Sequence, residues 1–286
     1  MQKSIDFIRD NLRGIYEPQE TEQFIVMIFR HLCGFSRADM IIHKNMELSD
    51  NLREEISRFT TRLKAHEPIQ YVLGECDFLD FTFNVRPGVL IPRPETEELI
   101  ELICNENRLP GTKVLDIGTG SGCIAVSVAR LLPDASVTAW DVSEQALEIA
   151  RENALKNKAA VDFALVDVLA VSPAEVPERF DIIVSNPPYV CHSEKAEMSP
   201  NVLRHEPHLA LFVDDADPLL FYRGIAELGR TLLNPGGRLY FEINALFGSE
   251  TLEMLRSLGY SDAAVVRDIH GKERMTRATF NPDKAL

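Results

Sequence analysis

The sequence of 286 residues has few cysteines, no long apolar run and no excess of basic residues. Its five cysteines lie far apart and form no Cys-x-x-Cys pair, a pattern that is typical of reduced cytosolic thiols. No apolar run approaches the ~18 residues that a membrane-spanning helix needs. Residues 1–6 lack the apolar segment and cleavage site of a signal peptide. We therefore expect a cytoplasmic protein with no membrane anchor.

The charge balance bears on the class of partner. Acidic residues outnumber basic ones by 44 to 30, which gives a formal net charge of −14. A protein that binds DNA or structured RNA normally carries a basic face, because neutralising phosphates supplies most of its non-specific affinity. The composition therefore favours a protein or small-molecule substrate and no direct contact with nucleic acid, although a local basic groove is compatible with these totals.

The most informative motif follows an apolar run at residues 180–185 and consists of Asn186, Pro187, Pro188 and Tyr189. Such a run is typical of a buried parallel strand, and open α/β sheets bind their ligands at the carboxyl ends of these strands. Two successive prolines stiffen the loop. The Asn186 amide oxygen and the Pro187 carbonyl can then accept both hydrogens of a planar –C–NH2 group, while the Tyr189 ring covers its face. The motif therefore predicts a site that reacts at an amide or amino nitrogen.

Because Asn-Pro is also common in ordinary turns, the upstream sequence has to decide between the two interpretations. A predicted strand at 113–117 runs into a glycine-rich loop and then a helical pattern. A second predicted strand, 136–141, ends in Asp141, where an acid can accept both hydroxyls of a ribose. Cys123 stands where a dinucleotide fingerprint has its last glycine, so an adenosine cofactor without a pyrophosphate is expected, and S-adenosylmethionine fits. The loop residues predicted to bind it are Gly118, Thr119, Gly120, Ser121 and Gly122.

The chain divides into regions of different pattern. Residues 1–66 show helical apolar stripes and predict a small bundle, and residues 67–94 predict a β-hairpin linker. From residue 95 to 286, helices and strands alternate, which predicts a doubly wound α/β sheet. The predicted strands lie near 113–117, 136–141, 161–166, 180–185, 237–243, 262–267 and 275–281.

Beyond the single motifs, the chain resembles the release factor glutamine methyltransferases along nearly its whole length. The segments that carry the resemblance are 68–75, 87–98, 117–122, 186–189, 206–207 and 210–212. The resemblance implies a class I S-adenosylmethionine-dependent methyltransferase fold, with a seven-stranded doubly wound sheet and a small helical N-terminal domain. It also implies methylation of the side-chain amide of the Gln in the Gly-Gly-Gln motif of peptide chain release factors.

The resemblance also assigns roles to single residues. Asp167 is expected to contact the adenine amino group, and Val168 to pack on the adenine ring. Asn186, Pro187 and Tyr189 are the expected catalytic residues, and together with Pro188 they are expected to bind the substrate. Asn186 also borders the cofactor. Residues 1–66 are expected to dock the body of the release factor. Two roles stay open: Arg93 either closes over the methyl donor or begins a helix, and Asp116 either supports the loop or contacts the cofactor's amino group.

Other functions remain compatible with the motif. Adenine N6 is the same kind of nitrogen as a glutamine amide, so an adenine methyltransferase of DNA or RNA is an alternative, as is a ribosomal-protein glutamine methyltransferase. A binder of release factors that does no chemistry is a third. His205 and His208 lie three residues apart without further ligands, so we expect a surface turn and no metal site. A monomer is expected.

Overall fold

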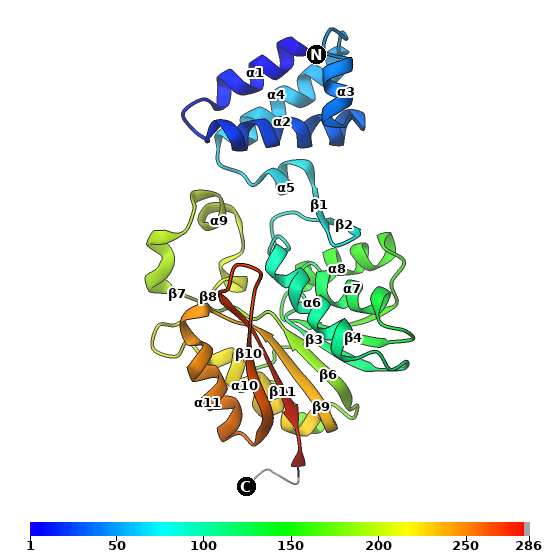
Figure 1. Ribbon diagram of the computed structural model, residues 1–286, viewed down its shortest axis with the longest axis vertical. Coiled ribbons are helices and arrows are strands. Elements are labelled where there is room, and N and C mark those ends of the chain that lie inside the picture. Colours follow the sequence, from blue (N-terminus) through cyan, green and yellow to red (C-terminus); the bar gives the residue numbers. More distant parts are fainter. Residues whose placement is uncertain (283–286) are drawn as a thin grey trace. The chain divides into compact units, whose positions relative to one another are not determined.

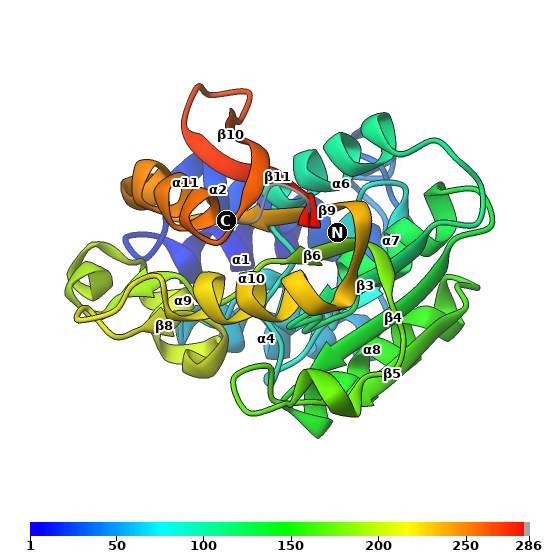
Figure 2. The ribbon, with the colours of Figure 1, turned by 90° about the horizontal axis from the view of Figure 1, so that it is seen from below.

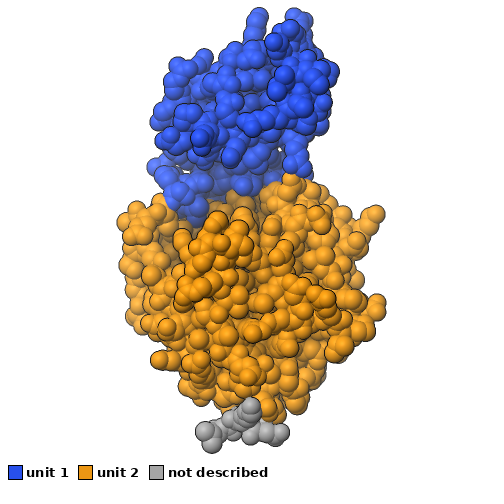
Figure 3. Space-filling view, viewed as in Figure 1, with its two compact units in different colours: residues 1–75, 199–205 blue, residues 76–198, 206–286 orange. Residues whose placement is uncertain are grey.

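The computed structural model describes residues 1–282, and the chain forms two compact units (Figure 3). The first unit comprises Met1–Glu75 and Ser199–His205, and the second comprises Cys76–Met198 and the chain from Glu206 onward. In the described residues, no helix is both long enough and apolar enough to cross a lipid bilayer.

The first unit is helical, and its helices between residues 2 and 73 share one apolar core. Ile8, Leu12, Ile28, Phe29 and Leu63 are all completely buried in it. Two of its helices begin directly after a serine, Ser36 or Ser49, whose side chain accepts a hydrogen bond from the backbone N–H of the third helical residue. The helices are α1 (Gln2–Leu12), α2 (Pro18–Cys33), α3 (Arg37–Ile42), α4 (Asp50–Lys64), α5 (Ile69–Leu73) and α9 (Pro200–His205) (Figure 1).

The region predicted as a hairpin linker, 67–94, is divided between the two units. Its first part forms α5, whose Ile69 and Val72 are buried in the helical core. The hairpin is shorter and consists of β1 (Glu75–Phe78) and β2 (Phe81–Asn84). The backbone N–H of Asn84 donates to Asn153 Oδ1 over 2.7 Å, and Asn153 Nδ2 donates to the Asn84 carbonyl over 3.0 Å. These bonds fix the hairpin to the second unit, so the boundary between units lies at residue 75.

The second unit is built on a seven-stranded sheet in the order β10-β11-β9-β6-β3-β4-β5. All its neighbours are parallel except β11, which runs antiparallel to both β9 and β10. This arrangement confirms the predicted doubly wound sheet, and β11 makes one edge of it antiparallel. The strands are β3 (Lys113–Ile117), β4 (Ser136–Asp141), β5 (Val161–Leu165), β6 (Phe180–Ser185), β9 (Leu233–Glu242), β10 (Tyr260–Arg267) and β11 (Glu273–Phe280).

Helices cover both faces of this sheet, and Figure 2 shows α6 and α10 on opposite sides of β9. Helix α7 contacts both α6 and α8, and α10 contacts α11. The helices are α6 (Pro94–Glu106), α7 (Cys123–Leu131), α8 (Glu144–Lys156), α10 (Leu220–Leu232) and α11 (Gly248–Ser257). Between β6 and β9 the chain also forms a short parallel pair, β7 (Val190–Cys191) with β8 (Phe212–Val213). Because both faces are covered, the buried positions of the central strands are mostly apolar, as their sequences predict.

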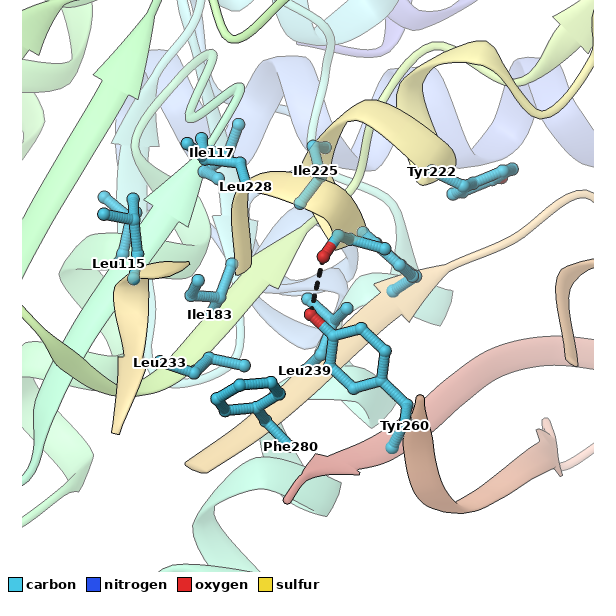
Figure 4. Close-up of a cluster of buried hydrophobic side chains, with 14 of the residues drawn as sticks. Leu115, Ile117, Ile183, Tyr222, Ile225, Leu228, Leu233, Leu239, Tyr260 and Phe280 are labelled. Atoms are coloured by element: carbon cyan, nitrogen blue, oxygen red, sulfur yellow. Dashed lines mark hydrogen bonds between the residues drawn. The ribbon is translucent and has the colours of Figure 1, made fainter. Parts of the chain in front are cut away.

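The core of the second unit lies between α10 and the sheet (Figure 4). Ile225 and Leu232 of α10 are completely buried, together with Ile183 of β6. Full burial of each such side chain contributes about 1.5–3 kcal/mol. The Tyr260 hydroxyl donates to the Ala226 carbonyl over 2.7 Å and ties β10 to the same helix. The core therefore holds the sheet in a single register.

Candidate active site

Strand register brings the three predicted motifs to one edge of the sheet. Ile117, the last residue of β3, pairs with Trp140 in β4 and with Ser185 in β6. The next residues along the chain are Gly118, Asp141 and Asn186, and they therefore lie side by side at one edge of the sheet. Ligands of doubly wound sheets bind at this carboxyl edge, next to the strands at which the order reverses.

A cavity of about 340 Å³ opens at this edge. Its lining includes Arg93 and Thr96 from the segment around the start of α6, and Phe221 and Ile225 from α10. Ten of the residues predicted to bind cofactor or substrate line it: Gly118, Thr119, Gly120, Ser121, Asp141, Asp167, Val168, Asn186, Pro187 and Pro188. The predicted residues Gly122 and Tyr189 do not line it.

The glycine loop has the backbone conformation that its sequence predicts. Gly118, Gly120 and Gly122 have φ angles of 74°, 55° and 81°, in the left-handed region that favours glycine. A Cβ on Gly122 would lie 3.1 Å from the Cβ of Ala150 in α8. Gly122 therefore permits close packing between α7 and α8, which explains why it does not reach the cavity. The other two glycines leave bare backbone at the cavity wall.

Asp141 joins the end of β4 to the glycine loop. Its Oδ2 accepts the Gly120 N–H over 2.8 Å, and its Oδ1 accepts the Ser143 N–H over 2.9 Å. Burial raises the pKa of Asp141, and these two hydrogen bonds act in the opposite direction. Each carboxylate oxygen keeps a further lone pair, so the side chain can also accept the two hydroxyls of a ribose.

Asp116 is completely buried beneath the loop and does not line the cavity. Its Oδ2 accepts the Thr119 hydroxyl over 2.6 Å and the Ala125 N–H over 3.2 Å. Burial raises the pKa of Asp116 to about 7, with a smaller contribution from the nearby Asp141 charge. These contacts show that Asp116 supports the loop. Its Oδ1 has no hydrogen-bond partner in the described part of the chain.

The Asn-Pro-Pro-Tyr loop presents two acceptors. Asn186 is half-buried, and its Nδ2 donates to the Thr96 hydroxyl over 3.3 Å. Its Oδ1 is therefore turned away from Thr96. In residues 1–282, no hydrogen-bond donor contacts Asn186 Oδ1 or the Pro187 carbonyl oxygen. Tyr189 is fixed from both sides, because its hydroxyl donates to Glu242 Oε1 over 3.0 Å and its carbonyl accepts Asn244 Nδ2 over 3.1 Å.

Two residues of this network, Thr96 and Glu242, were missed by the sequence analysis. The Thr96 hydroxyl donates to Glu242 Oε2 over 2.6 Å. Glu242 is only 1% exposed; burial raises its pKa, and the hydrogen bonds from Thr96 and Tyr189 act against that rise. A signal was present, because Glu242 lies between apolar residues near the end of the predicted strand 237–243, where a buried charge needs a reason.

Arg93 lies directly before α6 as its N-cap and also lines the cavity, so both of its predicted roles are compatible with its position. Its guanidinium pairs with Glu206 Oε1 over 2.5 Å, and Glu206 Oε2 accepts the Ile91 N–H over 3.1 Å. His205 and His208 make separate contacts, with the Ala65 carbonyl and with the Phe212 ring. No group of three or more His, Cys, Asp or Glu in the described residues could hold a metal ion.

The fold and the site define a class I S-adenosylmethionine-dependent methyltransferase. Residues 95–208 match the family described as the methyltransferase small domain, and residues 6–74 match the PrmC N-terminal domain. A solved structure of the T. thermophilus 16S rRNA N2 G1207 methyltransferase in complex with AdoMet and guanosine shares the fold. Its TM-score is 0.53 at 18% identity, and the match covers 72% of this chain and 50% of that one.

Two curated relatives identify the family. The release factor glutamine methyltransferase of Bacteroides thetaiotaomicron is 48% identical over 97% of this chain and 99% of its own length. That of Flavobacterium psychrophilum is 44% identical over 94% of this chain and 95% of its own length. The chain belongs to the release factor glutamine methyltransferase family, as its motifs predict.

Proposed function

We propose that this chain binds S-adenosylmethionine in the cavity and methylates the side-chain amide nitrogen of the Gln in the Gly-Gly-Gln motif of peptide chain release factors. The observation that carries the proposal is the orientation of Asn186, whose Nδ2 is held by Thr96, while Oδ1 and the Pro187 carbonyl have no donor among residues 1–282. Two neighbouring acceptors match the two hydrogens of a primary amide.

The residues around the cavity fit the methyl donor. The backbone at Gly118 and Gly120 would lie along its amino-acid part, and Asp141 would accept the ribose hydroxyls. Asp167 and Val168 would bind the adenine, as family resemblance implies.

The chemistry required of the protein is mainly positioning. An amide nitrogen is a poor nucleophile, because its lone pair is delocalised into the carbonyl, whereas the bound donor supplies an activated methyl group. Asn186 Oδ1 and the Pro187 carbonyl would hold the two N–H groups and stabilise positive charge as it develops on the nitrogen. No His or Lys in the described residues lines the cavity, and none is needed. After transfer the nitrogen is acidic, so its proton can leave to water.

The direct test is to incubate the chain with labelled S-adenosylmethionine, a bacterial release factor, and total RNA and DNA. Label is expected on the release factor, and a factor with the motif Gln changed to Ala should accept none. Label on nucleic acid alone would instead support the adenine methyltransferase, and cofactor binding without transfer would support a binder that does no chemistry.

The helical unit is proposed to bind the body of the release factor, because the amide site can hold any small primary amide and selectivity must arise elsewhere. The adjacent Ile41 and Ile42 of α3 are 70% and 72% exposed and give this unit an apolar contact surface. Replacing both with Ser should raise KM for intact release factor about tenfold, as expected when two apolar contacts are lost. Methylation of a short Gly-Gly-Gln peptide should not change.

A matched control is Leu109→Ser, since Leu109 is 79% exposed but belongs to the second unit. It should leave both KM values unchanged. An unaltered KM for intact release factor in the Ile41/Ile42 variant would show that this surface takes no part in docking.

A further inference from the structure

The Asn186 amide has an acceptor end and a donor end of nearly the same shape. If the group turned over, an NH2 would face the substrate amide and two donors would oppose each other. The proposed function therefore requires that some neighbouring group fix the orientation of Asn186. Only Thr96 contacts its side chain with a hydrogen bond in the described residues.

The Thr96 hydroxyl can fix that orientation because it has only one hydrogen. That hydrogen is donated to Glu242 Oε2 over 2.6 Å, the shorter of the two hydrogen bonds that Thr96 Oγ1 makes. Toward Asn186, the Thr96 oxygen can therefore only accept. It accepts from Nδ2 over 3.3 Å, so Oδ1 is turned away from Thr96.

Glu242 sets the direction of the whole chain of hydrogen bonds, since a carboxylate only accepts. Both of its oxygens are used, Oε2 by Thr96 and Oε1 by the Tyr189 hydroxyl over 3.0 Å. One buried carboxylate at the end of β9 thus holds both ends of the four-residue loop. It holds Asn186 through Thr96, and it holds Tyr189 directly. A buried charge of this kind is costly for stability, which favours a functional reason for its presence.

We propose that Thr96 and Glu242 are positioning residues for methyl transfer, and that they act by locking the Asn186 amide with its oxygen toward the substrate nitrogen. This inference rests on the proposed function, because it assumes that Asn186 Oδ1 receives the substrate amide. Neither residue needs to contact the reacting atoms.

The first test compares Thr96→Val with Thr96→Ser in the full-length chain, using S-adenosylmethionine and an intact release factor. Valine has the shape of threonine but no hydroxyl, so kcat should fall on the order of tenfold, the scale seen when an orienting neighbour is lost. Affinity for S-adenosylmethionine should stay unchanged. Serine restores the hydroxyl and should recover the wild-type kcat within about twofold.

Thr276→Val is the matched control, because Thr276 is also a buried threonine of the second unit but its hydroxyl has no hydrogen-bond partner in the described residues. It should leave kcat unchanged. If Thr96→Val also keeps the wild-type kcat, or if Thr96→Ser is as slow as Thr96→Val, the positioning role is wrong.

A double-mutant cycle with Asn186→Ala separates positioning from general damage. If Thr96 acts through the Asn186 amide, Thr96→Val should have almost no further effect on single-turnover transfer once that amide is removed. If the losses of transfer rate in the two single variants instead multiply in the double variant, the inference is wrong. Failure of the proposed function looks different, because the wild-type chain would then bind S-adenosylmethionine and transfer nothing to the release factor.

Glu242→Gln tests the direction of the network. Its NH2 group can only donate, so one of the two hydroxyls must turn its hydrogen away from residue 242. If Thr96 turns, it donates to Asn186 and inverts the amide. If Tyr189 turns instead, the other end of the loop loses its bond to residue 242. We therefore expect kcat to fall in either case, with S-adenosylmethionine affinity unchanged, and wild-type turnover by a folded Glu242→Gln chain would contradict the proposal.

Discussion

The two units bury different kinds of side chain. In the described residues, the buried polar groups of the helical unit are Thr21 and Thr60, and Thr60 only donates to the carbonyl of Ile56 in its own helix. The second unit buries four acids, Asp116, Glu206, Glu242 and Asp268. Burying a charge lowers stability unless it is paired, so such groups persist where they serve a site. The helical core is thus explained by stability alone, whereas the core of the second unit also has to be explained by chemistry.

The largest expected effect concerns stability in the helical unit. Phe29 is completely buried among apolar side chains, so Phe29→Ala should lower the free energy of unfolding of that unit by about 3–5 kcal/mol. Urea unfolding followed by fluorescence and circular dichroism measures this. The affinity of the folded variant for S-adenosylmethionine should be unchanged. If that affinity also fell, the helical core would serve cofactor binding as well as stability, and the two units would not differ in this way.

Substitution of Asp141 should instead lower the affinity for the cofactor. Removal of a carboxylate that accepts two ribose hydroxyls should weaken S-adenosylmethionine binding by roughly 2–4 kcal/mol in Asp141→Ala. Calorimetry measures the affinity. Because Asp141 also accepts two backbone N–H groups, circular dichroism must first show that the variant is folded. Unchanged affinity in a folded variant would mean that another residue binds the ribose.

Asn186→Ala should separate binding from chemistry within the second unit. The substitution removes one acceptor for the reacting amide and leaves the glycine loop intact. Methyl transfer should fall at least ~100-fold, equivalent to ~2.7 kcal/mol, the scale for loss of one preorganised polar contact. S-adenosylmethionine affinity should change little. Near-normal turnover, measured with labelled cofactor, would rule out the two-acceptor mechanism.

The last prediction concerns pH, and its effect is the smallest when counted per pH unit. Burial raises the pKa of Asp116 to about 7, so between about pH 4 and 7 the folded chain holds a proton that the unfolded chain releases. Stability should therefore fall as pH rises through this window, by about 1.4 kcal/mol per pH unit from this group. Asp116→Asn cannot titrate, so its stability relative to wild type should rise with pH by that amount.

The sequence was sufficient for everything that depends on local pattern. The expected strands at 113–117, 136–141 and 180–185 coincide with β3, β4 and β6, because buried parallel strands are continuous apolar runs. Their shared edge then follows from the rule that parallel strands end together. The family of the chain was also correctly predicted, and the roles of the single site residues stay predictions.

Contacts between distant residues could not be predicted in the same way. Thr96 and Glu242 are 146 positions apart, and no periodicity connects them. Gly122 looked like a cofactor residue because the loop pattern does not show that Ala150 packs against it. The unit boundary was expected at residue 66, since a five-residue helix such as α5 has too weak a pattern to assign it to a core.

The placement of α9 has a consequence for synthesis. This helix belongs to the helical unit, yet it follows Glu75 by more than a hundred residues, and His205 Nε2 contacts the Ala65 carbonyl over 3.1 Å. A ribosome that adds ~5–20 residues per second would need roughly 6–25 s to pass from residue 75 to residue 199. During that interval the nascent chain carries the first five helices without their sixth. The helical unit is thus first in sequence, but it is completed only after most of the sheet has been made.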